Sequence, residues 1–215
     1  GESIFVAEGE LLAMRLLESD YEVESVLVSE AFAERFHRAA SGRCPVYVAS
    51  ESLLVEVVGF PFHRGALAAG RRRPTPSLDE LVGRKGLSEP LSLVICPDVT
   101  KPENLGLVFR TAAAFGVDGV LLGRRCCDPL SRRALRLSMG GVLRVPWTRS
   151  ETLGDDLRAL KGHWRVELFA SVLDDRAERL MDLQWPPRAG LLLGNEMDGL
   201  GDQWLALCDR RVTIP

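Results

Sequence analysis

Short apolar runs alternate with segments of helical periodicity along the first third of the chain. Strands are predicted at residues 4–7, 25–28, 46–49 and 65–69, with helices between them at 8–19, 30–40 and 50–58. This alternation indicates a small α/β domain over residues 1–75. The sequence Pro74-Thr75-Pro76 breaks the pattern just before Ser77, which is typical of a helix start, so residues 76–90 are predicted as a linker.

The same alternation resumes from residue 91 to residue 215. Strands are predicted at 91–95, 119–122, 144–147, 165–170, 191–193 and 211–214, and helices at 104–115, 130–139, 152–160 and 200–207. Strands separated by helices of this length pair in parallel, with crossovers on both faces of the sheet. We therefore expect residues 91–215 to form a second α/β domain that binds its ligand at the carboxyl ends of its strands.

Composition places the chain among ordinary folded proteins, with 46% hydrophobic and 27% charged residues. Its apolar runs are far shorter than the ~18–20 residues of a membrane-spanning helix, and no signal peptide is visible, so we expect a cytoplasmic protein. The five cysteines have no C-x-x-C spacing and the three histidines are scattered singly. This favours reduced thiols and argues against a metal site.

Arginine dominates the basic residues, although the formal net charge is only −3. The guanidinium group pairs bidentately with phosphate, and arginines gather at two places: just before Pro74, and between residues 124 and 149, where Asp128 is the single acidic residue. Such clusters either solvate a helix face or bind nucleic-acid phosphates. The candidate RNA-binding residues are Arg71, Arg72, Arg73, Arg132, Arg133 and Arg136.

Several enzyme classes lack their local signatures. No G-x-G-x-x-G follows a predicted strand, and no phosphate-binding loop ending in Gly-Lys-Ser/Thr is present, which argues against a nucleotide-dependent oxidoreductase or a nucleotide hydrolase. No G-x-S-x-G nucleophile motif is found either.

Two segments carry polar residues in unusual positions. In the first, Pro102–Gly116, Asn104 is predicted as the helix N-cap, and Arg110 lies in an otherwise apolar helix. An arginine there is costly to desolvate unless it pairs, faces a cleft or lies on the outer surface. In the second, Leu191–Gly201, an apolar strand runs into a turn that carries Glu196 at the carboxyl end of the strand. Gly194, Gly199 and Gly201 permit positive φ angles or a close backbone approach there, although an ordinary strand-to-helix turn also uses such residues.

Together the two segments resemble the SpoU (TrmH-like) branch of the knotted SPOUT RNA methyltransferases. The pattern N-x-G-x-x-x-R-x-A-x-x-x-G is matched from Asn104 to Gly116, and L-x-L-G-x-E-x-x-G is matched from Leu191 to Gly199. Residues 137–146 and 212–215 are also similar to the family. The first 70 residues resemble its N-terminal ribosomal L30e-like substrate-binding domain, in Phe5–Gly9 and His63–Ala68.

The resemblance implies a trefoil-knot methyltransferase domain that uses S-adenosylmethionine to methylate a ribose 2′-hydroxyl of RNA, with rRNA favoured over tRNA. It also implies a homodimer in which arginines of one protomer complete the other's site. The family assigns Asn104, Arg110 and Glu196 to catalysis. Because a guanidinium with a pKa above ~12 is a poor base, we expect Arg110 to grip the target phosphate, and the proton acceptor stays open. The residues assigned to the cofactor are Gly194, Ile214, Leu193, Gly199 and Ser171.

The family pattern continues beyond the position of Pro215 with a Ser-Leu-Asn motif that covers the cofactor and completes the knot. We therefore expect residues 1–215 alone to bind adenosylmethionine poorly, and a longer chain carrying the motif to bind it. The alternative function is a non-catalytic RNA-binding or ribosome-assembly factor on the same fold, against which the retention of Asn104, Arg110 and Glu196 argues.

Overall fold

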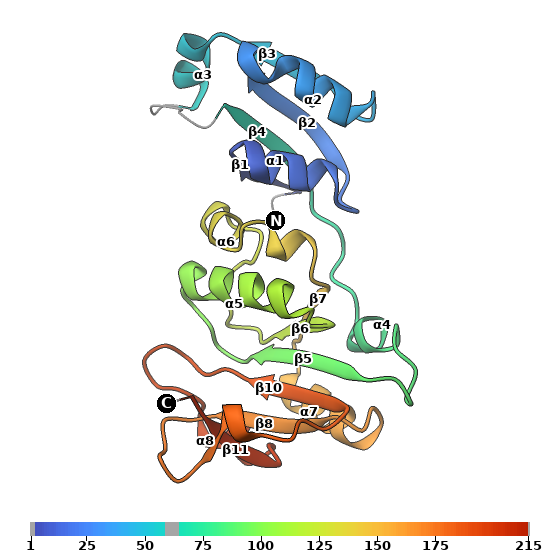
Figure 1. Ribbon diagram of the computed structural model, residues 1–215, viewed down its shortest axis with the longest axis vertical. Coiled ribbons are helices and arrows are strands. Elements are labelled where there is room, and N and C mark those ends of the chain that lie inside the picture. Colours follow the sequence, from blue (N-terminus) through green and yellow to red (C-terminus); the bar gives the residue numbers. More distant parts are fainter. Residues whose placement is uncertain (1–2, 59–64, 215) are drawn as a thin grey trace.

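The computed structural model describes residues 3–58 and 65–214 of the 215-residue chain. The molecule is elongated, with a small sheet and its helices above a larger sheet (Figure 1). Of the predicted L30e-like segment His63–Ala68, His63 and Arg64 lie outside the described residues.

The smaller sheet has the strand order β1-β4-β2-β3, and β4 pairs antiparallel with both β1 and β2, whereas β3 pairs parallel with β2. Alternate strand residues such as Phe5, Ala7, Val26 and Val28 are buried, as expected for strands packed on helices. The strands of this sheet are β1 (Ile4–Glu8), β2 (Val23–Ser29), β3 (Val46–Ala49) and β4 (Ala66–Arg71), and its helical segments are α1 (Glu10–Leu17), η1 (Glu30–Phe32), α2 (Ala33–Ala40) and α3 (Glu51–Val58).

The segment predicted as a linker contains a short helix, α4 (Leu78–Val82). Ser77 and Glu80 form a reciprocal capping box, in which the Glu80 N–H donates to Ser77 Oγ at 3.2 Å and the Ser77 N–H donates to Glu80 Oε2 at 2.7 Å. Leu81 and Val82 are buried, and α4 packs on β6 and β7. Residues 77–82 therefore belong structurally to the larger sheet.

The larger sheet has the order β7-β6-β5-β10-β8-β11-β9, and every neighbouring pair is parallel. This confirms the parallel sheet predicted from the alternation of strands and helices. Its strands are β5 (Leu91–Cys96), β6 (Gly119–Leu122), β7 (Trp147–Arg149), β8 (Glu167–Ser171), β9 (Glu178–Arg179), β10 (Arg188–Leu192) and β11 (Arg210–Thr213).

Helices cover both faces of the larger sheet. Leu105 and Phe109 of α5 pack with Val120 and Leu122 on one face, while Leu121 packs with α4 and α7 on the other. The helical segments of this region are α5 (Pro102–Phe115), α6 (Arg132–Leu137), η2 (Gly141–Leu143), α7 (Leu153–Gly162), η3 (Leu180–Asp182) and α8 (Asp202–Leu205). In the described part of the chain, no helix combines the length and the apolar character that spanning a membrane requires.

Helix α5 begins earlier than the sequence pattern predicts. Its N-cap is Lys101 and Pro102 occupies the first turn, so the prediction of Asn104 as the N-cap is wrong. Proline suits this position because its fixed φ is already helical and the first N–H groups of a helix need no intrahelical acceptor. Asn104 consequently lies within the first turn, where its side chain is not needed for capping.

The predicted strand at 144–147 lies later, at Trp147–Arg149; Gly141–Leu143 form η2, and the residues between the two are irregular. Gly140 has a φ of +77°, which turns the chain out of α6, and Val142, Leu143 and Val145 are buried without being extended. A short apolar run fits a buried turn as well as a buried strand, which is why periodicity alone misassigned it.

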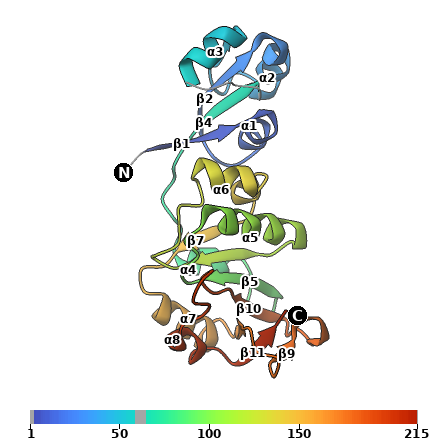
Figure 2. The same ribbon diagram turned by 90° about the vertical axis from the view of Figure 1, so that its left-hand side faces the viewer.

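The smaller sheet shares one buried cluster with the α5 side of the larger sheet. Phe5, Leu12 and Leu16 belong to the same buried cluster as Leu105 and Phe109. Helix α6 lies between α5 and the smaller sheet in both side views (Figures 1 and 2) and packs on β1.

Two ion pairs also cross this junction. Arg132 Nη2 lies 2.8 Å from Glu8 Oε2, and the Arg72 guanidinium donates to both carboxylate oxygens of Asp128 at 3.2 and 2.5 Å. The smaller sheet is therefore docked on the larger domain by apolar packing and by charge.

Candidate active site

A tight turn follows β10 at the carboxyl edge of the larger sheet. The Asn195 N–H donates to Gly199 O at 2.8 Å, and the Gly199 N–H donates back to Asn195 O at 3.0 Å. Gly199 has a φ of +68°, a left-handed conformation that favours glycine. Gly194 is needed for a different reason, because a Cβ there would lie 2.3 Å from Gly199 C.

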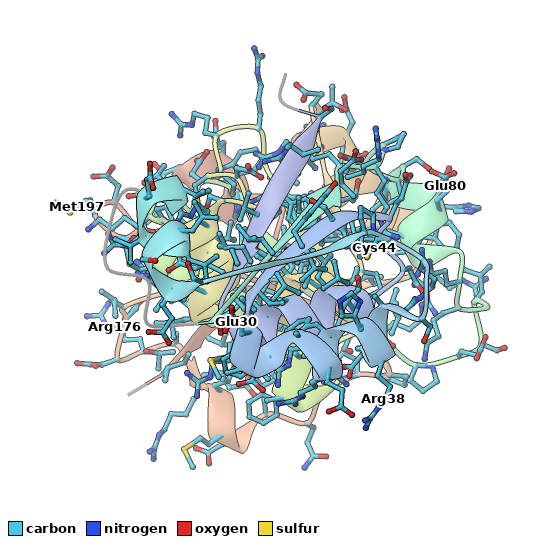
Figure 3. The ribbon with its side chains drawn as sticks, turned by 90° about the horizontal axis from the view of Figure 1, so that it is seen from above. Glu30, Arg38, Cys44, Glu80, Arg176 and Met197 are labelled. Atoms are coloured by element: carbon cyan, nitrogen blue, oxygen red, sulfur yellow. The ribbon has the colours of Figure 1, made fainter. Side chains whose placement is uncertain are left out.

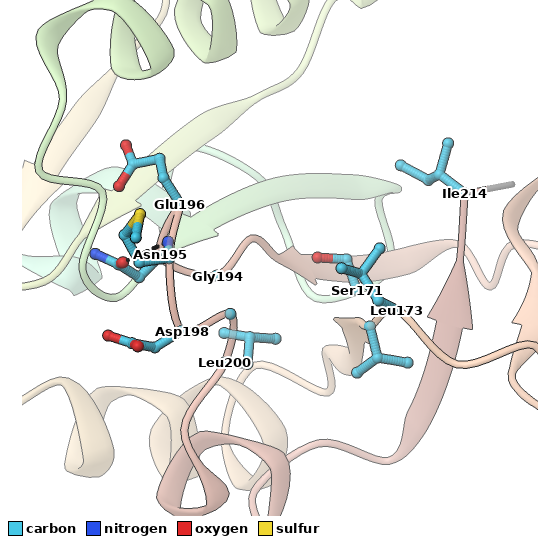
Figure 4. A pocket seen from close by; sticks show the side chains of 11 residues that line it. Ser171, Leu173, Gly194, Asn195, Glu196, Asp198, Leu200 and Ile214 are labelled. Atoms are coloured by element: carbon cyan, nitrogen blue, oxygen red, sulfur yellow. Dashed lines mark hydrogen bonds between the residues drawn. The ribbon is translucent and has the colours of Figure 1, made fainter.

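The turn forms one wall of a cavity of about 440 Å³ at the carboxyl ends of β8, β10 and β11. Figure 4 shows Ser171 at the end of β8, Leu173 just after it and Ile214 after β11, across the cavity from the turn. Ser171 Oγ donates to Leu192 O at 2.8 Å, which ties the end of β8 to β10. The residues that line the cavity are Ser171, Val172, Leu173, Gly194, Asn195, Glu196, Met197, Asp198, Gly199, Leu200 and Ile214.

Four of the five residues predicted to bind the cofactor thus meet in this cavity, while the fifth does not line it. Leu193 continues the strand, with its N–H donating to Ile95 O at 2.9 Å, and its side chain packs against the core that contains α5. Met197, which also lines the cavity, is exposed and lies at the edge of the molecule when it is viewed from above the smaller sheet (Figure 3).

Glu196 joins this turn to the start of α5. Its carboxylate accepts the Lys101 N–H at 3.2 Å and Thr100 Oγ1 at 3.4 Å. Burial acts to raise the pKa of Glu196, but hydrogen bonds from its own N–H, from Lys101 and from the Asn104 side chain outweigh it, and the net pKa lies below the ordinary value. Glu196 is therefore an ionised acceptor at neutral pH, and the structure brings Asn104 and Glu196 together.

Arg110 occupies a different place. It lies on the exposed face of α5, almost two turns beyond Asn104, and among the described residues no ion pair or hydrogen bond of its guanidinium is found. The structure does not bring Arg110 against Glu196 within one chain.

Most of the predicted RNA-binding arginines have acidic or aromatic partners. Arg71 lies 3.1 Å from Glu22 and 2.5 Å from Glu24, and Arg73 lies over the Tyr21 ring, 4.3 Å from its centroid. Arg133 lies 2.5 Å from Glu103, while Arg72 and Arg132 form the two pairs at the junction of the sheets. Arg136 is exposed at the end of α6.

Asp98 and Arg125, which support the turn after β10, were not identified from the sequence. Asn195 Nδ2 donates to Asp98 O at 2.8 Å, and the Asp98 carboxylate accepts two bonds from Arg125, both at 2.8 Å. The bond from Arg125 lowers the pKa of Asp98 against the effect of burial. Asp98 directly follows the apolar run that predicts β5, so its position at a strand end was an available signal.

The chain matches known proteins over its whole length. Residues 92–215 match the SpoU rRNA Methylase family. An uncharacterised tRNA/rRNA methyltransferase of Mycobacterium bovis is 35% identical over 219 residues, covering 100% of this chain and 74% of that protein. The 23S rRNA (guanosine-2′-O-)-methyltransferase RlmB of Acinetobacter baylyi is 31% identical, covering 79% of this chain and 68% of that protein.

Solved structures agree with these matches. The SpoU methyltransferase AviRb of Streptomyces viridochromogenes, in complex with AdoMet, superposes with a TM-score of 0.80 at 22% identity, covering 99% of this chain and 81% of that one. A TrmH-family RNA methyltransferase of Porphyromonas gingivalis gives a TM-score of 0.78 at 25% identity, covering 99% and 80%. The fold, the matched segment and the residues gathered at the turn lead to one conclusion: the chain belongs to the SpoU rRNA methylase family of RNA methyltransferases.

Proposed function

We propose that this protein methylates a ribose 2′-hydroxyl of ribosomal RNA. The observation that carries the proposal is the junction at Glu196, where a cavity at the carboxyl edge of a parallel sheet meets the first turn of α5. The similarity to RlmB of Acinetobacter baylyi, whose name specifies 23S rRNA and the guanosine 2′-oxygen, supports the ribose and the rRNA.

The cavity fits S-adenosylmethionine, the cofactor bound in the AviRb structure. Its walls combine apolar side chains, including Leu200 and Ile214, with the backbone of a turn that leaves no room for a Cβ at Gly194. Gly194, Gly199, Ile214 and Ser171 would hold the group, which supplies an electrophilic methyl on its sulfonium sulfur.

The chain's own residues have positioning and electrostatic roles in this proposal. Glu196 holds the turn in register with α5 through the Lys101 N–H, and the Asn104 side chain lies against the same carboxylate. An entering ribose is oriented by these fixed groups, which lowers the entropic cost of bringing its hydroxyl to the reacting position.

Arg110 binds the phosphate beside the target ribose, and its exposure on α5 suits a site completed by a second copy of the chain. We propose a homodimer on this ground, in which Arg110 of one protomer serves the cavity of the other. Residues 1–75 are proposed as the RNA-binding domain, with Arg71–Arg73 as phosphate contacts. The arginines of α6, in the larger domain, are proposed as further phosphate contacts.

The test is a methylation assay with the full-length protein, rRNA and labelled adenosylmethionine, followed by nuclease digestion and mass spectrometry of the nucleosides. A 2′-O-methylated nucleoside is expected, and a base-methylated product would contradict the proposal. Arg110→Ala should abolish transfer while circular dichroism and thermal unfolding stay unchanged, because Arg110 is exposed and has no ion pair or side-chain hydrogen bond among the described residues. Turnover at the wild-type rate in this variant would remove Arg110 from the site.

A further inference from the structure

A second cleft lies next to the active-site turn, at the carboxyl ends of β5, β6 and β7. It has a volume of about 230 Å³. We call it the β5–β7 cleft. Its lining residues are Pro97, Asp98, Gly123, Arg124, Arg125, Ser150, Glu151, Leu153, Gln203 and Trp204.

One wall of the cleft is the loop after β6, which Arg149 holds in place. Arg149 donates from Nη1 to the carbonyls of Gly123, Arg124 and Cys126 at 3.0, 3.2 and 2.8 Å, and from Nη2 to the carbonyl of Cys127 at 2.9 Å. Gly123 also approaches β5 so closely that a Cβ there would lie 2.1 Å from Pro97 O. A loop fixed by four such bonds presents the next two side chains, Arg124 and Arg125, in a defined place.

The polar groups of the cleft suit a nucleotide. The Arg124 and Arg125 side chains are 79% and 74% exposed, so both guanidinium groups remain accessible although each has a carboxylate neighbour. Trp204 is half-buried and gives the wall an aromatic surface, and Gln203 offers both a donor and an acceptor. Ser150 Oγ is buried without a hydrogen-bond partner in the described residues, which is unusual for a hydroxyl in a wall that serves only for packing. Unpaired bases of RNA are bound by aromatic and guanidinium surfaces, and their phosphates by arginine.

The cleft is also mechanically joined to the active-site turn. The Trp204 side chain lies close enough to the Asp98 carboxylate to help lower its pKa, after the larger effect of Arg125, and the Asp98 carbonyl accepts the Asn195 amide of the turn at 2.8 Å. The segment from Gly194 to Trp204 therefore contributes to the cofactor cavity at one end and to the cleft at the other.

We propose that the β5–β7 cleft binds an unpaired nucleotide of the substrate RNA that neighbours the methylated one, with the base against Trp204 and the phosphate on Arg124 and Arg125. The proposal rests on the function proposed above. In this proposal, Gln203 and Trp204 contact the base that neighbours the methylated nucleotide and so set which RNA sequence is preferred there. Asp98 links these two residues to the active-site turn.

The experiment measures RNA binding directly, so that it does not depend on turnover. Full-length wild-type protein, Arg124→Glu and the matched control Arg158→Glu are titrated with an rRNA fragment at several salt concentrations. Arg158 of α7 is also exposed, at 65% against 79% for Arg124; its ion pair in the described residues is with Asp155, and it does not line the cleft. Arg124→Glu is expected to weaken RNA binding about tenfold and to reduce the slope of log affinity against log salt by ~0.7, the value for one phosphate contact on a single strand. Adenosylmethionine affinity should stay at the wild-type value in both variants.

Trp204→Phe supplies the second readout, since it keeps an aromatic ring but removes one indole fluorophore. A short single-stranded RNA should quench the tryptophan fluorescence of the wild type, and this quenching should be lost in Trp204→Phe. An Arg124→Glu affinity equal to that of Arg158→Glu, or quenching that persists in Trp204→Phe, overturns the proposal. RNA binding and quenching without methyl transfer would instead refute the proposed function and leave the cleft as an RNA site.

Discussion

Gly194→Ala tests whether the close approach within the active-site turn controls cofactor binding. The added methyl would lie 2.3 Å from Gly199 C and 2.5 Å from Leu200 N, both backbone atoms that cannot rotate aside. The turn must open, and the two hydrogen bonds between Asn195 and Gly199 are then lost or lengthened. At a net ~0.5–1.5 kcal/mol for each bond, the cost is about 1–3 kcal/mol, which is also the usual range for an overpacked site.

The expected result follows from that cost. A loss of about 1–3 kcal/mol lowers the Tm of a protein of this size by roughly 2–12 °C. If the turn in its native shape is needed for binding, the same free energy weakens adenosylmethionine binding by about 5- to 150-fold, measured by calorimetry on the full-length protein. The matched control is Gly201→Ala, which adds the same methyl in the same segment where nothing lies within 4 Å and φ is −65°. Equal Tm and equal cofactor affinity in the two variants would refute the reasoning.

Further outcomes test the electrostatics of the site and of the surface. Glu196→Gln should lower methyl transfer and remove the loss of cofactor affinity at acid pH. The folded pKa of Glu196 is lowered, so the ionised carboxylate stabilises the turn fully above its ordinary pKa of ~4.3. That stabilisation is lost as pH falls through the lowered value. An unaltered rate and affinity would make Glu196 a bystander. Replacing Arg132, Arg133 and Arg136 together by Gln should flatten the salt dependence of RNA binding, and an unchanged slope would mean that α6 faces away from RNA. Cys127 should resist alkylation at pH 8, because burial raises its pKa to about 11 and leaves ~0.1% thiolate, against roughly a quarter for a free thiol; labelling at the rate of a free thiol would contradict this.

Local patterns predicted much of the fold. The apolar runs that became β5, β6, β8 and β10 are short and flanked by helical periodicity, and that is enough to predict parallel pairing because only a crossover can connect such strands. The order in which the strands lie in the sheet is not local information. The insertion of β11 between β8 and β9 depends on side chains that meet only in the folded molecule.

The candidate site was also predicted only in part. Ser171, Gly194, Gly199 and Ile214 follow strand ends, and the carboxyl edge of the sheet collects them in one cavity. Leu193 also follows a strand, but the alternation of side chains turns it to the opposite face, into the core.

The arginines could not be interpreted from sequence alone. The ion pairs of Arg132 with Glu8 and of Arg72 with Asp128 join residues 124 and 56 positions apart. A cluster of arginines in the sequence therefore does not reveal how many of them pair with carboxylates from the other half of the molecule.

The shared buried cluster also fixes the distance between the smaller sheet and the Glu196 turn. Phe5 and Leu12 of the smaller sheet and its helix are buried in the same cluster as Phe109, so the two halves of the molecule cannot swing about residues 72–76 as beads on a string would. An RNA that touches the smaller sheet and the Glu196 turn at once has to match a rigid span along the long axis of the molecule. Under the proposed function, an RNA whose part bound to the smaller sheet lies at the wrong distance from the target ribose cannot be accommodated by bending the enzyme, and has to deform or be rejected.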